Sequence, residues 1–360
     1  MSKRINQVEP NIADDDILSV NQYISSDSWV TEHKKTRELE DQIGKFVGRK
    51  YSIAVPNGTI ALYLSLLASG LSKGKRVAVP NMTMVATINA VLWADCEPVL
   101  VDVNDRLCMS LESLKSIENL DGLIYVPLNG RTEEGLDIQE YCENNEIVLI
   151  EDSAHALGSR YESQNCGQLG KLSTLSFTPH KIITMGQGGM VLTDDLNLFE
   201  YLEKIKTFNR SKDKSDWHEG FGLNFKITDL QASLGLSQFA KLERFINQKK
   251  ETLKHYEQYL DENLIIKFYE YETPWFFDVV CKSIDEKNQL NEYLKQNNIE
   301  SRDAYPPLSK QKFLKETEKT DLSHSESIAE RILWLPSSTN LTELQIKSIS
   351  EKINIFFKEN

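Results

Sequence analysis

The sequence predicts an α/β fold, with a large domain over residues 1–245 built on a mixed, mostly parallel sheet and a smaller C-terminal α+β domain over residues 246–360. The chain has 360 residues, 40% of them hydrophobic, which is enough to bury two cores. Between residues 36 and 195, short apolar runs alternate with segments of helical length, as in a sheet covered by helices on both faces. Beyond residue 228 a long charged helix takes over, which places the connection between the domains.

The apolar runs of the large domain are predicted to be its strands. Two of them, 174–178 and 189–195, are separated by a turn instead of a helix, which indicates an antiparallel addition and therefore a mixed sheet. The other five lie at residues 51–55, 76–80, 98–103, 123–128 and 147–152.

The C-terminal part has its own pattern of elements. Residues 229–260 read as one long connecting helix with a solvated face. A strand over 276–283 follows, then a helix over 285–298 and a closing helix over 341–359. This arrangement predicts the α+β domain.

Composition excludes several classes of function. The formal net charge is −13 and no block is rich in Lys or Arg, so we expect no nucleic-acid partner. The five cysteines are scattered without a CxxC pair, which predicts free thiols and no metal site. There is no signal-peptide core, and no apolar run reaches the roughly 18 residues of a membrane span. We therefore expect a cytoplasmic protein with no membrane association.

A pair of carboxylates ends the predicted strand 147–152. Glu151 and Asp152 lie at the carboxyl edge of the sheet, where α/β folds place ligands. A carboxylate at the end of a buried strand needs a cationic or hydrogen-bonding partner, and a protonated pyridine nitrogen is one. The alternative is an Asp that caps the next helix.

Lys181 lies on a short connection between two apolar runs, with Phe177 before it and Ile182 and Ile183 after it. A lysine attacks an aldehyde only when its neutral amine is available, which requires partial removal from water. The apolar flanks favour such a nucleophile over an ordinary surface charge.

Two more segments are consistent with an anion site and a loop contact. Gly58 and Thr59 follow a strand at the start of an apolar helix, where free N–H groups and the helix dipole attract a phosphate. An Asn-Gly turn with a Thr cap is the alternative there. Asn224 lies on a predicted loop before a helix.

These segments occur in the order and spacing of the sugar aminotransferases of the DegT/DnrJ/EryC1/StrS family, a branch of the fold type I (aspartate-aminotransferase-like) pyridoxal phosphate enzymes. The sequence resembles most the perosamine-synthase-like members, which act on nucleotide-linked 4-keto-6-deoxy sugars. The resemblance spans nearly the whole chain and is carried by residues 25–40, 57–62, 79–87, 150–158, 176–181, 186–193, 222–238, 298–305 and 333–338.

The resemblance implies a cofactor, pyridoxal 5′-phosphate (PLP, with its amino form PMP), and a role for each matching residue. Lys181 matches the Schiff-base lysine, Asp152 the partner of the ring nitrogen, and His155 a neighbour of the 3-hydroxyl. Asn224 matches a residue that reaches the phosphate from the other subunit, which implies a homodimer with shared active sites. Glutamate is implied as amino donor, and surface polysaccharide or glycoconjugate biosynthesis as the setting. The phosphate cradle is matched by Gly58, Thr59 and Ser176.

Departures from the family pattern lie near the cofactor and the acceptor. Met84 stands where an aromatic side chain is usual, and LNGR at 128–131 replaces a tyrosine-containing segment. Asn129 and Arg131 of that segment are therefore candidate substrate residues. The other substrate candidates are Trp29, His180, Trp217, His218, Arg302 and Tyr305.

Three alternatives accompany this interpretation. The first is a different acceptor, either another small keto sugar or a ketose or triose phosphate. Relatives with His in place of the lysine dehydrate a deoxysugar, but the shared Ile-Thr-Met-Gly aligns Lys181, not His180, with the Schiff-base position. A non-catalytic regulator on the same fold is the third alternative, since fold alone does not fix function.

Overall fold

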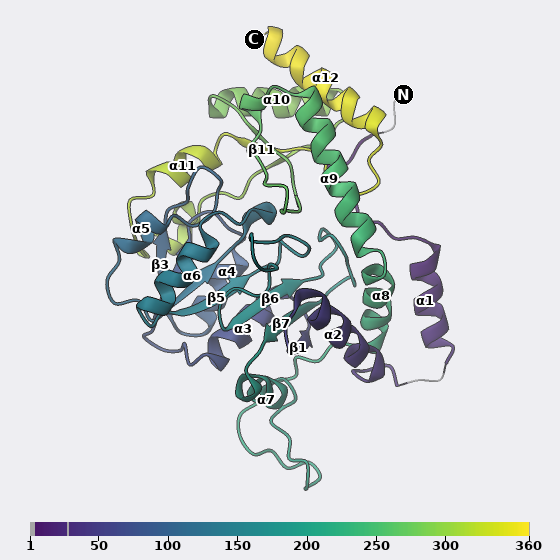
Figure 1. Cartoon of the computed structure of the whole chain (residues 1–360), viewed down its shortest axis with the longest axis vertical. Helices are drawn as coiled ribbons and strands as arrows, with labels where there is room; N and C mark the ends of the chain where they lie inside the picture. Colours follow the sequence, from purple (N-terminus) through teal and green to yellow (C-terminus); the bar gives the residue numbers. More distant parts are fainter. Residues whose placement is uncertain (1–3, 27–28, 360) are drawn as a thin grey trace.

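The structure, a computed structural model, describes residues 4–26 and 29–359 (Figure 1). Its centre is an eight-stranded sheet in the order β1-β7-β6-β5-β4-β2-β3-β10. The strands are β1 (Tyr51–Val55), β2 (Arg76–Pro80), β3 (Glu97–Val101), β4 (Gly122–Tyr125), β5 (Val148–Asp152), β6 (Leu172–Ser176), β7 (Gly189–Thr193) and β10 (Glu318–Lys319).

The sheet is mixed, as predicted. Strands β2 to β6 pair in parallel, whereas β7 pairs antiparallel with both β6 and β1. Strand β10 comes from the C-terminal part of the chain and pairs in parallel with β3, at the edge of the sheet. The carboxyl ends of β5 and β6 therefore meet at one edge, beside the turn that leads into β7.

Helices cover both faces because successive strand residues point to opposite sides. Ile53 and Val55 of β1 belong to a core shared with α3, α4 and α7, whereas Ala54 belongs to the core of α2 and α8. The bounds are α2 (Lys34–Val47), α3 (Gly58–Ala68), α4 (Ala86–Trp93), α5 (Leu111–Lys115), α6 (Gly135–Asn144), α7 (Leu196–Ile205) and α8 (Asp229–Phe239).

A second, three-stranded sheet in the order β8-β11-β9 forms the C-terminal part, above the large sheet in Figure 1. Its core lies between β8, β11 and the helices α9, α10 and α12. The bounds are α9 (Leu242–Tyr259), β8 (Asp278–Val280), α10 (Ile284–Gln296), β9 (Arg302–Asp303), α11 (Ser323–Ala329), β11 (Ile332–Trp334) and α12 (Glu343–Glu359).

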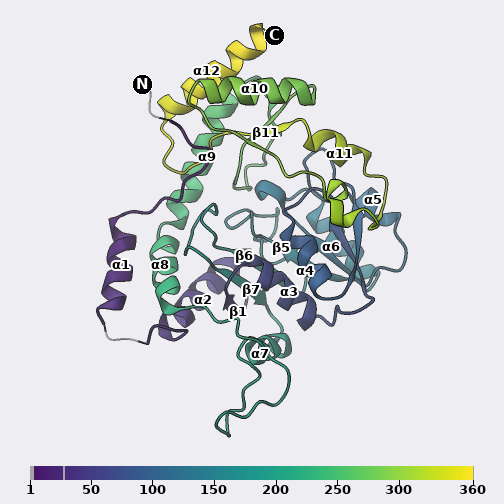
Figure 2. The same cartoon turned by 180° about the vertical axis from the view of Figure 1, so that it is seen from behind.

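The long helix predicted over 229–260 is two helices, α8 and α9, and this part of the prediction was wrong. The chain turns at residues 240 and 241, where the Lys241 ammonium points inward to Asp15 and Asp16 at 2.9 and 2.6 Å. Both acids begin α1 (Asp14–Ile24), which packs along α8 in Figures 1 and 2. A contact across more than 200 residues of sequence leaves no local signal.

The proposed division at residue 245 stays a prediction. Helix α9 runs through it, and Ile5 near the N-terminus bridges to Ile299 of the C-terminal part. Short 3-10 turns complete the described elements, at Leu128–Gly130, Glu262–Leu264, Leu308–Lys310 and Lys312–Leu314. Within residues 4–26 and 29–359, every helix falls short of the length and apolar character that crossing a membrane requires.

Candidate active site

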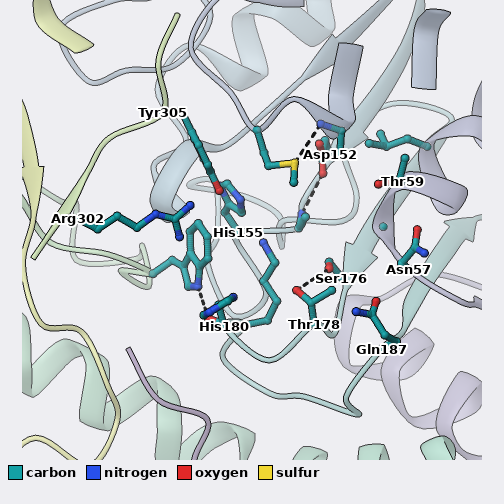
Figure 3. Close-up of a pocket in the computed structure, with 17 residues that line it drawn as sticks. Asn57, Thr59, Asp152, His155, Ser176, Thr178, His180, Gln187, Arg302 and Tyr305 are labelled. Atoms are coloured by element: carbon teal, nitrogen blue, oxygen red, sulfur yellow. Dashed lines mark hydrogen bonds between the residues drawn. The ribbon is translucent and has the colours of Figure 1, made fainter. Parts of the chain in front are cut away.

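A cavity of about 440 Å³ opens at the carboxyl ends of β5 and β6, beside the first turn of α3 (Figure 3). Three side chains of the C-terminal part line it: Trp275 before β8, Arg302 in β9 and Tyr305 just after β9. The lining residues are Asn57, Gly58, Thr59, Leu62, Met84, Ala86, Asp152, Ala154, His155, Ser176, Thr178, His180, Lys181, Gln187, Trp275, Arg302 and Tyr305.

Asp152 is the acid of the cavity. It ends β5 and is 5% exposed, with its Oδ2 accepting a hydrogen bond from Thr87 Oγ1 at 2.9 Å. Burial raises the pKa of this carboxyl, and the Thr87 hydrogen bond and the Lys181 cation oppose that rise. The next described element after β5 is the strand β6, so the alternative role as a helix cap does not fit.

Glu151, next to Asp152, has a different environment. It is fully buried and accepts hydrogen bonds from the backbone N–H groups of Gly167 and Leu169 and from the Tyr161 hydroxyl. Its oxygens therefore hold the turn before β6. Of the two predicted strand-end acids, only Asp152 lines the cavity.

Lys181 lies on the turn between β6 and β7, and its Nζ is 4.1 Å from the centre of the Trp275 ring. Burial lowers the pKa of Lys181 to about 7, with the Asp152 carboxylate opposing and Arg302 assisting the change. A large fraction of the amine is therefore neutral near neutral pH, which a nucleophilic lysine requires.

An anion cradle lies on the other side of the cavity. The Asn57 side chain caps α3 by accepting the Ile60 N–H at 3.0 Å, which leaves the N–H groups of Gly58 and Thr59 at the open first turn. A Cβ on Gly58 would lie 3.1 Å from the Ser176 Cβ, so the backbone needs a small residue here. Free N–H groups, a helix dipole and a serine hydroxyl suit a phosphate.

Aromatic rings form the wall beneath the C-terminal part. His155 stacks on Trp275 with centroids 3.9 Å apart and planes at 27°, and Tyr305 lies 5.9 Å from His155. Burial holds the pKa of His155 well below its usual range, so the ring is neutral. Its Nδ1 is buried and has no hydrogen-bond partner among the described residues.

Most predicted cofactor residues come together in this cavity, and only some predicted substrate residues do. Met84, which is 41% exposed, lines it together with His180, Arg302 and Tyr305. Asn224, Trp29, Trp217 and His218 are exposed and lie outside the lining.

Asn129 and Arg131 also lie outside the lining, for a different reason. Both side chains are fully buried and bind the same carboxylate, Asp278 of β8, at 3.0 and 2.5 Å. The segment 128–131 thus joins the large sheet to the small one, and its placement gives no support to direct substrate contact.

Several site residues were not predicted from the sequence. Thr87 and Asn57 lie within the segments that carried the resemblance, so both could have been predicted as polar residues of the site. Thr178 and Gln187 flank the Lys181 turn. Trp275 had no signal, because its place in the wall depends on how β8 packs on the large sheet.

Comparison with known proteins agrees with this geometry. A model of the DegT/DnrJ/EryC1/StrS aminotransferase family matches residues 10–354. The GDP-perosamine synthase of Escherichia coli O157:H7 is 29% identical over 370 aligned positions that cover 99% of this chain and 100% of that protein.

Solved structures show the same fold. Helicobacter pylori PseC, an aminotransferase involved in the biosynthesis of pseudoaminic acid, has a TM-score of 0.93 at 22% identity, over 99% of this chain and 100% of that one. The PLP form of the putative sugar aminotransferase Spr1654 from Streptococcus pneumoniae has a TM-score of 0.91 at 21% identity, over 99% of both chains. The predicted fold class is confirmed.

Proposed function

Because the chain belongs to the DegT/DnrJ/EryC1/StrS aminotransferase family and is thus a PLP-dependent aminotransferase, we propose that it moves an amino group from glutamate to a nucleotide-linked keto sugar. One observation carries the proposal: a lysine with a lowered pKa, a buried carboxylate and an open helix N-terminus line one cavity. These are the groups that an aldehyde, a pyridine nitrogen and a phosphate require.

The cavity presents polar groups that match those of the cofactor. The first turn of α3 offers N–H donors, Asp152 is a buried acid near the other end, and His155 Nδ1 lacks a partner. Gly58, Thr59 and Ser176 would bind the phosphate. When bound, PLP supplies an aldehyde that takes up the amino group, and a ring that withdraws electrons from the substrate carbon.

Three residues of the chain would then have separate roles. Asp152 would keep a proton on the ring nitrogen, and its burial strengthens that pairing. Lys181 would attach the cofactor and, once released, carry a proton at Nζ to and from the substrate carbon. His155, neutral and buried, would face the ring hydroxyl.

The acceptor is proposed from the relatives. The E. coli protein is named GDP-perosamine synthase, and the name supports a nucleotide-linked 4-keto-6-deoxyhexose as acceptor here too, in surface polysaccharide or glycoconjugate biosynthesis. Another small keto sugar, or a ketose or triose phosphate, is the second candidate, favoured by the departure at Met84, which lines the cavity.

The acceptor is tested by incubating the purified protein with glutamate and a panel of keto-sugar nucleotides, and by detecting the aminated product by mass. Phosphorylated ketoses and trioses serve as the competing panel. We expect amination of a nucleotide-linked keto sugar with formation of 2-oxoglutarate. Amination of the phosphorylated sugars alone would contradict the acceptor and leave the cofactor proposal intact.

The dehydratase alternative has less support. Lys181 Nζ lies over Trp275 in the cavity wall, whereas the His180 side chain is exposed and its backbone carbonyl accepts the Trp275 indole N–H at 2.7 Å. A product that lost oxygen without gaining an amino group would favour dehydration instead.

We also propose a homodimer with shared sites. Asn224 lies on the segment between α7 and α8, which extends away from the rest of the chain in Figures 1 and 2 and carries exposed Phe221 and Trp217. In a dimer, this arm would place Asn224 at the partner's phosphate.

Subunit mixing tests the dimer. Lys181→Ala and Asn224→Asp are each expected to be nearly inactive, and a mixture of the two should recover activity because each mixed dimer has one intact site. Mixtures that stay inactive, with mixed dimers detected by native mass spectrometry, would contradict the shared site.

A further inference from the structure

Trp275 touches the immediate surroundings of Lys181 in three ways. Its indole N–H donates to the carbonyl of His180 at 2.7 Å, its ring lies 4.1 Å from Lys181 Nζ, and the same ring stacks on His155 at 3.9 Å. Its other stacked neighbour is Phe276, at 3.8 Å. The side chain is 5% exposed. Trp275 is thus packed between protein groups and is poorly placed to stack on a substrate.

The hydrogen bond to His180 acts on the peptide that leads into Lys181. The His180 carbonyl and the Lys181 N–H belong to one planar unit, so fixing both ends fixes its orientation. The Lys181 N–H donates to the Thr178 carbonyl at 3.0 Å, and the Trp275 indole holds the opposite end. The direction in which the Lys181 side chain leaves the turn therefore depends on Trp275.

The backbone of Trp275 is itself held by two groups from different elements. Its backbone N–H donates to the Asn129 carbonyl at 2.9 Å, and its carbonyl accepts from Lys249 Nζ at 2.7 Å. Lys249 lies on α9, is 3% exposed, and also donates to the Ser337 carbonyl. Among the described residues, the polar contacts of Lys249 are these two backbone carbonyls, and no charged partner offsets its burial.

From this chain of contacts we infer that Trp275 is a positioning residue that fixes the direction of the Lys181 side chain, and that Lys249 anchors it. The inference rests on the proposed function of Lys181. It assigns Lys249, a buried amine that lies outside the cavity lining and contacts it through the Trp275 carbonyl, to the same task. The packing of α9 and Ser337 in the C-terminal part therefore affects the orientation of Lys181 on the large sheet.

The decisive variant is Trp275→Phe, which keeps an aromatic ring and removes the N–H donor. We expect kcat to fall roughly tenfold, in keeping with the loss of one buried hydrogen bond, with KM for both substrates nearly unchanged. Visible circular dichroism of the cofactor-loaded protein, divided by its absorbance, reports the orientation of the bound cofactor without catalysis, and we expect this ratio to fall.

Tyr256→Phe is the matched control. It also removes one hydrogen bond of a buried aromatic side chain, from the Tyr256 hydroxyl to the Pro336 carbonyl at 3.0 Å, without touching the cavity. We expect a similar loss of thermal stability with an unchanged dichroism ratio and kcat. If Trp275→Phe behaves as this control does, the residue is only structural and the inference is wrong.

Lys249→Met tests the anchor against Lys250→Met. Lys250, next along α9, is half-buried and donates to the Glu270 carbonyl at 2.8 Å in a solvent-exposed hydrogen bond. We expect Lys249→Met to lower the dichroism ratio and kcat in the same direction as Trp275→Phe, and Lys250→Met to leave both unchanged. Equal behaviour of the two methionine variants would overturn the role of Lys249.

The outcomes separate this inference from the proposed function. A wild-type protein that stays colourless with added PLP would overturn both. A coloured, active wild type, together with a Trp275→Phe variant whose kcat and dichroism ratio are unchanged, would overturn the inference alone.

Discussion

At the scale of the residue, burial acts on Asp152 and Lys181 in opposite directions. It raises the pKa of the carboxyl and lowers the pKa of the amine, so each is pushed toward its neutral form. Their mutual attraction opposes both changes. A bound cofactor that places a cationic ring nitrogen by the acid would restore the charge of Asp152.

The first prediction concerns the pH dependence of turnover. In the proposed function the neutral amine of Lys181 would accept the proton of the substrate carbon, and burial lowers the pKa of this amine to about 7. Because the protonated form dominates below that value, kcat should rise about tenfold per pH unit on the acid side and level off above it. Steady-state kcat against pH, at saturating glutamate and acceptor, measures this. A flat profile through this region would contradict the assignment.

The second prediction concerns the charge of Asp152. Asp152→Asn keeps an oxygen for the Thr87 hydrogen bond and removes the negative charge. We expect kcat to fall about a hundredfold to a thousandfold, as when a preorganised electrostatic group is removed, with the fold intact by thermal unfolding. Thr87→Val is the companion variant, because it removes the hydrogen bond and keeps the charge, so its loss should be smaller. An unchanged kcat in Asp152→Asn would exclude the pairing with the ring nitrogen.

At the scale of the element, the phosphate cradle depends on how closely β7 approaches α3. A Cβ on Gly189, the first residue of β7, would lie 2.4 Å from the Asn57 carbonyl carbon and 2.8 Å from the Gly58 nitrogen. Both are backbone atoms and cannot rotate away. The glycine pair after the Lys181 turn therefore lets the strand reach the turn that begins α3.

The third prediction follows from that contact. Gly189→Ala should push the first turn of α3 away from β7, lower stability by about 1–3 kcal/mol as overpacking does, and weaken retention of PLP during dialysis. Gly235→Ala on α8 is the control, since its Cβ would meet only side-chain ends of Leu39 and Met185 at 3.1 Å. Equal PLP retention in wild type and Gly189→Ala would argue against this cradle.

Elements with a local cause were predictable and those with a distant cause were not. Strands 51–55 and 76–80 were predicted with the bounds of β1 and β2, because continuous apolar runs mark strands buried on both faces. The break between α8 and α9 depends on Lys241 meeting acids of α1. Asn129 and Arg131 were assigned to the substrate because their segment departs from the family pattern, yet Asp278, far along the chain, binds both.

At the scale of the whole molecule, the lysine, the acid and the phosphate cradle come from the large sheet, and the aromatic and cationic wall comes from the C-terminal part. Trp275, Arg302 and Tyr305 complete the cavity from that side. The resemblance predicted Arg302 and Tyr305 at its mouth, whereas Trp275 required the packing of the two parts. Asn129 is one of the groups that join them, because its side chain binds Asp278 and its carbonyl accepts the Trp275 backbone N–H.

The fourth prediction concerns stability against pH. Burial lowers the pKa of Lys249 from 10.5 to about 7, so between these values the unfolded chain binds a proton that the folded chain has released. The stability contributed by this group therefore rises with pH across that window. Relative to Lys249→Met, the wild type should gain thermal stability as the pH increases from neutral toward 10.5. A pH-independent difference between the two would mean that Lys249 stays charged in the fold.

Strand β10 has a consequence for how the chain reaches its native state. It pairs with β3 and so covers what would otherwise be an open edge of the large sheet. Yet β10 lies more than two hundred residues after β3, and emerges late from the ribosome. Until it arrives, the N–H and C=O groups along that side of β3 can pair with another nascent chain, so yield on expression should depend on synthesis rate and chaperones even where the finished protein is stable.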